Sequence, residues 1–244
     1  MKKYLFASVL SFIMVYGLFA QEQKINQTDA RGLKQGVWEE KTATGISKGM
    51  YLDDMKEGNW IMHGSNGNLT RIESFSKGIR DGIFVEIDQR GYLVSEMYYE
   101  NNLPEGVAKK FFYGTNPASV IEYKQGKMNG KKKEYYENAA GKLKEESDYR
   151  DDVKDGTSTF FAVSGDPIAE YTYKNGSLEG VQKTYYAGKK LMSEQNYVNN
   201  IESGFYKEYF ESGKIKVETT YKDGVMDGKY VEYDEEGKVK TEGF

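Results

Sequence analysis

Residues 221–239 read YKDGVMDGKYVEYDEEGKV, and this stretch decides the fold. Glycine stands at positions 224, 228 and 237, and tyrosine stands at 221, 230 and 233. Glycine is favoured in tight turns because it adopts left-handed backbone conformations readily, whereas aromatic residues favour strands. The stretch therefore predicts strands that alternate with short glycine turns, which is the plan of a β-hairpin.

The hairpin plan recurs along the chain at a nearly fixed period. We call the recurring residues the anchor glycines: Gly36, Gly58, Gly82, Gly106, Gly130, Gly156, Gly180, Gly204 and Gly228. Six of the eight steps between them are 24 residues, one is 22 and one is 26. Because a fixed period in this range marks a repeat array, the repeat outranks any single local motif.

The residue four positions before each anchor glycine is always Gly, Asn or Asp. These residues are Gly32, Asp54, Gly78, Asn102, Gly126, Asp152, Gly176, Asn200 and Gly224. Since these residue types best tolerate a left-handed backbone, we predict a positive φ at this position in most repeats. Seven positions before the anchor, from the second repeat on, the residue is aromatic: Tyr51, Phe75, Tyr99, Tyr123, Tyr149, Tyr173, Tyr197 and Tyr221.

The segment from this aromatic residue to the anchor glycine never changes length. We therefore predict a rigid turn within it, and a permissive second turn that absorbs the 22- and 26-residue steps. In the long repeat the second turn reads ENAAGK, with two extra residues. The predicted fold is all-β: an elongated, single-layer antiparallel meander of about nine 24-residue hairpins over residues 31–244. At ~4.8 Å per strand the ribbon would be about 80 Å long.

The first residues predict export. Lys2 and Lys3 precede an apolar run that ends at Ala20, as in a secretory signal peptide of residues 1–20, and residues 21–30 form a short linker. The alternative is a membrane anchor, for which the run is short. The chain has no cysteine, so it carries neither a lipid-accepting cysteine nor a disulfide framework. We expect an exported protein, periplasmic or extracellular, that is not a lipoprotein and has no transmembrane span after cleavage.

The repeat resembles a known family. YKDGVMDGKY (221–230), YKNGSLEGVQ (173–182) and FSKGIRDGIF (75–84) resemble the bacterial variant of the MORN repeat, whose members are often described as antitoxin-like. The resemblance covers residues 31–244 and implies an elongated antiparallel sheet with a role in protein or membrane association. The chain departs from the MORN pattern two residues after the anchor. An aromatic residue is present there at Trp38, Trp60, Phe84, Tyr206 and Tyr230, and is replaced by Ala108, Lys132, Ser158 and Gln182.

Strand alternation predicts two faces. We expect the series Tyr51 to Tyr221 on a structural face, with residues five after the anchor: Ile87, Phe111, Tyr135, Phe161, Tyr185, Tyr209 and Tyr233. The opposite face would bind a partner through Tyr136, Tyr186, Tyr206, Glu208, Phe210, Tyr230 and Glu232. Returning strands would add Glu96, Glu146, Glu170, Glu194, Glu218 and Glu242 to it. Exposed aromatic residues beside acidic ones can bind the basic or apolar residues of a partner protein, or stack on a sugar. The alternative is that both faces are structural.

The residues argue against catalysis. The only histidine, His63, occupies a position filled elsewhere by aromatic residues, which predicts a packed structural role. The sequence indicates no metal site and no cofactor, and its glycines open no helix that would hold a phosphate. Loss of Lys2 and Lys3 would lower the net charge from −4 to −6, which does not favour nucleic acid as a partner. We expect a non-enzymatic scaffold that binds a protein or a cell-envelope component. The alternatives are an exported antitoxin or immunity protein, and a protein that binds or acts on polysaccharide.

Overall fold

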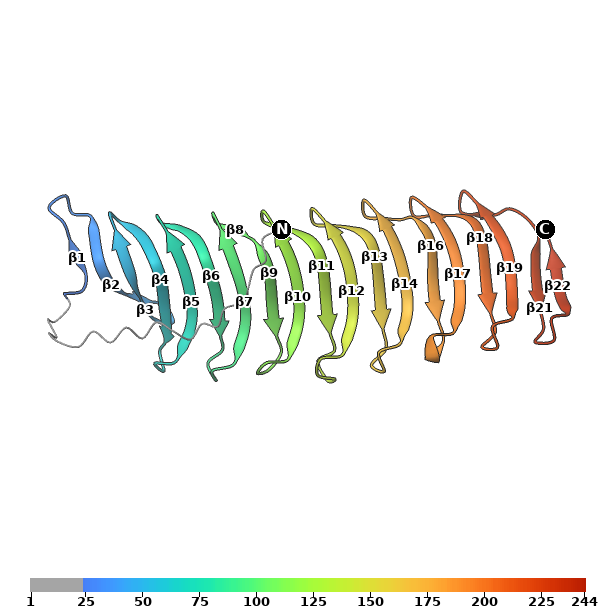
Figure 1. Cartoon of the computed structure of the whole chain (residues 1–244), viewed down its shortest axis with the longest axis horizontal. Helices are drawn as coiled ribbons and strands as arrows, with labels where there is room; N and C mark the ends of the chain where they lie inside the picture. The colour runs from blue at the N-terminus through green and yellow to red at the C-terminus, as the bar shows by residue number, and fades with distance from the viewer. Residues whose placement is uncertain (1–23) are drawn as a thin grey trace, which may run out of the picture.

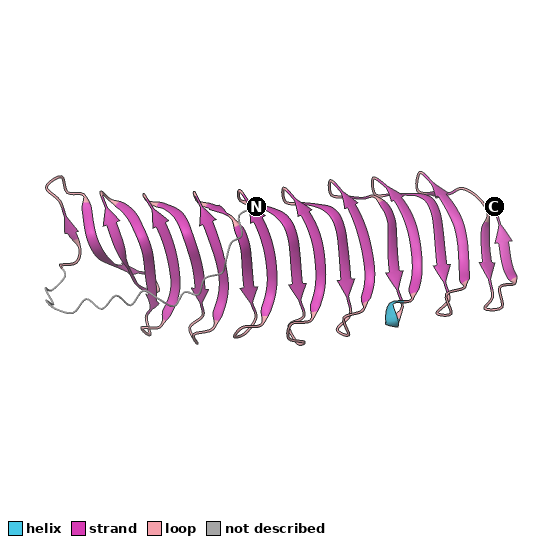
Figure 2. Ribbon diagram, in the orientation of Figure 1, coloured by secondary structure: helices cyan, strands magenta, loops and turns pink. Residues whose placement is uncertain are grey.

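The computed structural model describes residues 24–244 and confirms the predicted fold. Antiparallel hairpins stand side by side in one row and form a single open sheet of 22 strands (Figure 1). In this part of the chain strands and turns make up nearly the whole ribbon. One short 3₁₀ turn, η1 (Ala187–Lys189), lies in the loop between two paired strands (Figure 2). The predicted signal peptide and the first residues of the linker lie outside the described residues.

The elements follow one another along the ribbon in chain order. They are β1 (Gln27–Thr28), β2 (Lys34–Thr42), β3 (Gly45–Leu52), β4 (Met55–Gly64), β5 (Leu69–Ser76), β6 (Ile79–Ile87), β7 (Leu93–Glu100), β8 (Leu103–Pro104), β9 (Gly106–Phe111), β10 (Pro117–Lys124), β11 (Lys127–Tyr135), β12 (Leu143–Arg150), β13 (Val153–Phe161), β14 (Pro167–Lys174), β15 (Ser177–Leu178), β16 (Gly180–Tyr185), β17 (Leu191–Val198), β18 (Ile201–Tyr209), β19 (Ile215–Lys222), β20 (Val225–Met226), β21 (Tyr230–Tyr233) and β22 (Val239–Gly243).

The rigid turns have the predicted left-handed backbone. All nine residues four positions before an anchor glycine have a positive φ, between 64° and 85°. From the second repeat on, the residue before each of them is also left-handed, as at Asn199 (φ 49°) and Asn200 (φ 68°). Two successive left-handed residues form a type I′ turn, whose twist matches that of the flanking strands. The sequence did not indicate the first of these residues, because Lys77 and Gln125 also occupy it.

Neighbouring rigid turns are bonded to one another. The N–H of Asn200 donates to the carbonyl oxygen of Leu178 at 3.0 Å, and the same bond recurs at every rigid turn from Asp54 to Gly224. Where the residue is Asn or Asp, its side chain also accepts the N–H of the previous turn, as Asn200 Oδ1 does from Leu178 at 2.6 Å. Glycine alternates strictly with Asn or Asp from turn to turn. Two kinds of rigid turn therefore alternate along this edge.

The glycine turns leave room for an apolar side chain of the preceding turn. A Cβ placed on Gly176 would lie 3.0 Å from Cγ1 of Val153, and one on Gly126 would lie 3.1 Å from Cδ2 of Leu103. Each Asn or Asp turn therefore packs its apolar residue against the glycine of the next turn.

The second turns absorb the differences in length, as predicted. In most repeats a five-residue loop closes with a bond such as Phe210 N–H to the carbonyl oxygen of Lys214, at 2.9 Å. In the 26-residue repeat the equivalent bond joins Tyr136 to Lys142 at 2.9 Å, around a longer loop. In the 22-residue repeat only residues 43–44 separate β2 from β3.

One face of the sheet carries most of the buried residues, and we call it the packed face. Cross-strand partners share a face, and the pairs Gly204–Tyr221, Tyr206–Thr219 and Glu208–Val217 place the Tyr51-to-Tyr221 series there. The buried residues on this face include Ser47, Tyr51, Trp60, Glu73, Ala108, Ser147, Ser158, Ala169, Gln182, Val217 and Thr219. Val231 is buried on the opposite face, which we call the open face.

Large and small side chains alternate on the packed face. Trp60, at 0% exposure, lies directly over Gly49, where any Cβ would clash with the indole ring. In the middle repeats the order is reversed, since Ser158 pairs with Tyr171. At Ser158, the aromatic volume that is missing two positions after the anchor is thus supplied by the cross-strand neighbour Tyr171.

The predicted division of residues between the faces is wrong. Tyr209 and the equivalent residues five after each anchor lie on the open face, opposite the Tyr51-to-Tyr221 series. The reason is a β-bulge near the second turn: Glu208 pairs with Val217, but Tyr209 pairs with Ile215. One extra residue in the returning strand therefore ends the alternation that the sequence pattern assumes.

Candidate binding faces

Four of the seven predicted binding residues lie together on the packed face. They are Tyr206, Glu208, Tyr230 and Glu232, and Glu208 and Glu232 flank Val217 on the two neighbouring strands. They were expected opposite the Tyr197–Tyr221 series, and this expectation is wrong because Gly204 pairs with Tyr221. Their cross-strand partners therefore belong to the packed face.

The two glutamates of this group are already paired within the chain. Glu208 accepts a hydrogen bond from Lys216 Nζ at 2.7 Å, and Glu232 accepts one from Lys240 Nζ at 2.8 Å. These bonds raise the pKa of both lysines. Tyr206 Oη lies 3.5 Å from Glu208, and burial raises the pKa of this phenol. The group is a half-buried, charge-balanced surface, and its role in binding stays a prediction.

The other three predicted residues lie at the second turns. Tyr136 Oη donates to the carbonyl oxygen of Phe161 at 2.6 Å, and Tyr186 Oη donates to that of Tyr209 at 3.0 Å. Each bond joins one second turn to the next repeat. Phe210 is half-buried, and its N–H closes its own turn. These contacts give Tyr136 and Tyr186 a structural role in addition to the predicted one.

The glutamate series lies on the open face, not with Tyr206 as predicted. Glu194 pairs in register with Lys183 and Lys207, and Lys207 pairs in turn with Glu218. We call this central row the open-face ladder. Its glutamates are Glu96, Glu146, Glu170, Glu194, Glu218 and Glu242, and its lysines include Lys109, Lys133, Lys183 and Lys207. Opposite charges beside one another stabilise a sheet by ~0.2–1 kcal/mol per pair.

Tyrosines of the open face are bonded to this ladder. Tyr209 Oη donates to Glu194 Oε1 at 2.6 Å, and Tyr233 Oη donates to Glu218 Oε1 at 2.7 Å. Burial, together with this bond and the charge of Glu194, raises the pKa of Tyr209 to about 12. In the C-terminal half of the open face, two glutamates of the ladder are thus hydrogen-bonded to tyrosines of the same face.

The N-terminal half of the open face differs in chemistry at the same positions. There the ladder runs Lys48, Ile61, Ile72 and Val85 before it reaches Glu96. Ile61 is 38% exposed, and Ile72 and Val85 are half-exposed. The adjacent row on this face adds Met50, Ile83, Tyr98 and Val107, which are 51%, 46%, 46% and 46% exposed.

We call these seven apolar residues, namely Met50, Ile61, Ile72, Ile83, Val85, Tyr98 and Val107, the open-face patch. The patch was not predicted from the sequence, because the predicted binding face was built on aromatic residues and glutamates. The signal lay in the residues three after the anchor and three before the aromatic, where isoleucine and valine replace lysine and glutamate. Contiguous exposed apolar residues of this kind mark interaction sites in soluble proteins.

Comparison with known proteins identifies the repeat. Residues 178–199, 204–223 and 226–244 match the model of the MORN repeat variant family. These three segments are similar to the MORN repeat variant. MORN repeat proteins are commonly binding scaffolds, typically without catalytic activity, and their repeats suggest protein binding. A search of curated proteins found no match to the chain.

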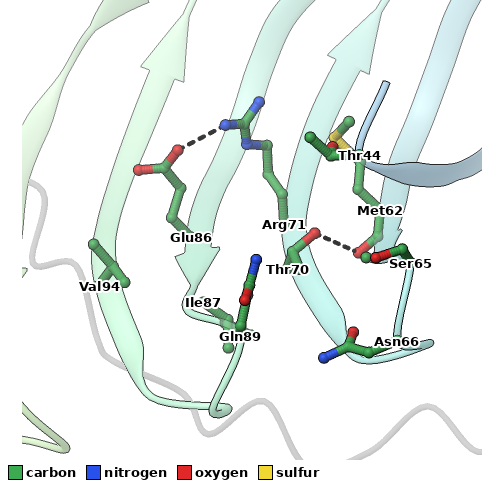
Figure 3. Close-up of a pocket in the computed structure, with 11 residues that line it drawn as sticks. Thr44, Met62, Ser65, Asn66, Thr70, Arg71, Glu86, Ile87, Gln89 and Val94 are labelled. Carbon is green, nitrogen blue, oxygen red and sulfur yellow. Dashed lines mark hydrogen bonds and ion pairs between the residues drawn. The ribbon is translucent and has the colours of Figure 1, made fainter. Parts of the chain in front are cut away.

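The hairpins near the N-terminus also border a hollow of about 430 Å³ (Figure 3). It lies beside the short turn of the 22-residue repeat, and Thr44 lines it. Arg71 and Glu86 face each other across it, with Arg71 Nη2 2.8 Å from Glu86 Oε1, and Thr70 donates to the carbonyl oxygen of Met62 at 3.2 Å (Figure 3). Its polar groups thus already bond one another, and it offers a shallow polar surface.

Two further features bear on activity. His63 is exposed and pairs with Leu69, so the predicted packed role is wrong: in this repeat the position five after the anchor lies at the rim of the open face. Among residues 24–244, no group of His, Asp or Glu is arranged to hold a metal ion. Over the same residues, no helix has the length and apolar character needed to cross a bilayer.

Proposed function

We propose that the chain is an exported, non-enzymatic binding scaffold that docks a partner protein on the open-face patch. The observation that carries the proposal is the replacement of the lysine–glutamate ladder by Ile61, Ile72 and Val85. At most of the other ladder positions the residue is charged, the exceptions being Val120, Thr159 and Val231, so the fold does not require an apolar side chain at this position in every repeat. Exposure of these side chains to water is unfavourable. A partner that covers them would gain about 25 cal/mol of binding free energy per Å² of apolar surface buried.

The test restores the residues that the other repeats carry at these positions. The variant combines Ile61→Thr, Ile72→Glu and Val85→Lys, so that the ladder reads Lys, Thr, Glu, Lys, Glu, with Thr matching Thr159. We expect it to lose the protein that the wild type captures from a cell-envelope extract, as judged by mass spectrometry of the retained material. Full burial of a Val or Ile side chain contributes about 1.5–3 kcal/mol, and the variant removes this contribution at three neighbouring positions.

The matched control changes the ladder outside the patch. Lys133→Thr, Lys183→Thr and Lys207→Thr together should leave capture unchanged, and thermal melting of both triple variants checks that each remains folded at the temperature of the capture experiment. Equal capture by the two variants would contradict docking on the patch, and so would capture of a glycan in place of a protein. A retained toxin would narrow the proposal to an immunity protein.

Export is the second part of the proposal, and it is supported by residues 1–20 of the sequence. The charged start and the apolar run ending at Ala20 predict cleavage that leaves Gln21 as the first residue. Intact-mass measurement of the protein from the periplasm or medium should give the mass of residues 21–244. Recovery of the uncut chain in the membrane fraction would contradict export as a cleaved protein.

A further inference from the structure

The order of residues along the open-face ladder is close to self-complementary around Ile72. From β2 to β9 the row reads Glu39, Lys48, Ile61, Ile72, Val85, Glu96 and Lys109. Read in reverse, each charged residue meets one of opposite sign, and each apolar residue meets an apolar one. This symmetry belongs to seven consecutive ladder positions and is centred on the open-face patch.

We propose that the partner docked on the open-face patch is a second copy of this chain, packed face to face with its ribbon antiparallel. The inference rests on the proposed function, which assigns docking to this patch. A two-fold axis along β5 through Ile72 places Ile61 of each copy against Val85 of the other. Two sheets that pack in this way lie about 10 Å apart, with interdigitating side chains.

The same axis pairs the charges at both ends of the patch. Lys48 lies opposite Glu96 of the second copy, and Glu39 lies opposite its Lys109. Within one copy Lys109 Nζ already bonds Glu96 Oε1 at 2.6 Å, so each end of the interface is a network of four charges. A parallel arrangement would instead place Lys48 over Lys48 and Glu96 over Glu96. Like charges in contact are a strong element of specificity, and they select the antiparallel arrangement.

The next row and the available area agree with this arrangement. The axis brings Met50, which is 51% exposed, over Tyr98 of the second copy, which is 46% exposed. Seven strands at ~4.8 Å and about eight residues at ~3.3 Å give a face of roughly 850 Å² per copy, close to the ~800 Å² per partner of a standard interface. A single-layer sheet would thereby gain a second layer over its least polar region.

The experiment reverses charges and then restores the match. Sedimentation of the purified protein should show a dimer. Lys48→Glu should raise the Kd of this dimer at least about tenfold, because the new carboxylate at each end of the interface lies opposite Glu96 of the other copy. Glu96→Lys alone should weaken the dimer similarly, while Lys48→Glu combined with Glu96→Lys should restore it. Lys207→Glu, on the same ladder but outside the patch, should leave the Kd unchanged. Thermal melting of each variant separates loss of the dimer from loss of the fold.

Two outcomes would overturn the inference. A wild type that remains monomeric at about 0.1 mM, where a Kd of micromolar order would give mostly dimer, excludes the second copy as the partner. A dimer whose Kd is unchanged by both Lys48→Glu and Glu96→Lys excludes the antiparallel register. Neither outcome affects the proposed function, because loss of a different captured protein by the Ile61, Ile72 and Val85 variant would still support docking on the patch.

Discussion

Replacement of Trp60 by alanine should lower the free energy of unfolding by about 3–5 kcal/mol, the range for a large buried aromatic residue. Trp60 is fully buried although the sheet is a single layer. Its indole lies over Gly49, meets Tyr51 edge-to-face at 4.9 Å between ring centroids, and carries Lys56 Nζ at 4.0 Å from its own centroid. Its Nε1–H donates to the carbonyl oxygen of Met50 at 3.1 Å. Within residues 24–244 the sheet has no second layer that could refill the space.

The matched control is Trp38→Ala, because Trp38 occupies the equivalent position one repeat earlier and is half-exposed. We expect a loss of about 1–2 kcal/mol there, in proportion to the smaller area that is buried. Urea unfolding gives the two losses, and hydrogen exchange in β3 and β4 shows whether the damage is local, as nearest-neighbour coupling in a repeat array predicts. Equal losses for the two tryptophans would contradict the role of Trp60 as the local core.

Gly176→Val should destabilise the protein by about 2 kcal/mol. Gly176 has φ 84°, and a left-handed backbone costs a residue with a Cβ ~1–2 kcal/mol, more for a β-branched one. The new Cβ would also lie 3.0 Å from Cγ1 of Val153 in the preceding turn. The loss is read from the urea midpoint at constant m-value.

A two-residue insertion after Gly188, in the second turn of the same region, is the comparison. It should cost less than about 1 kcal/mol, because lengthening a flexible loop adds little closure entropy. The loop that Tyr136 and Lys142 close already carries two extra residues at the equivalent place. If the insertion proved as damaging as Gly176→Val, the distinction between rigid and permissive turns would be wrong.

The fold could be predicted from the sequence because its turns depend on local backbone preferences. Gly, Asn and Asp at one position in nine repeats specify left-handed residues, and their constant distance from the anchor glycine then specifies a turn of fixed length. Length changes were correctly assigned to the second turn for the same reason. These features can be predicted without knowing which side chains pack together in the folded protein.

The two faces could not be predicted from alternation alone. A β-bulge depends on the pairing of two strands, so the shift between Glu208 and Tyr209 has no signature in either strand alone. The consequence is that Tyr206 and Tyr230 share a face with Tyr221. Changing them to serine is therefore expected to cost stability as well as any binding. The open-face patch carried a signal, but it was visible only once the register had paired Ile61 with Ile72.

Because two kinds of rigid turn alternate, the array can be lengthened by duplication without disturbing its turn contacts only in pairs of hairpins. An Asn or Asp turn packs its apolar residue on the glycine of the next turn and accepts an N–H of the previous one, as Asn200 does from Leu178. Duplication of a single hairpin would place two turns of one kind side by side, with either a clash or an unfilled gap between them. Duplication of a pair of hairpins preserves every junction. The shortest duplication that preserves every junction in this ribbon is therefore two hairpins, about 48 residues, which is twice the spacing of the anchor glycines.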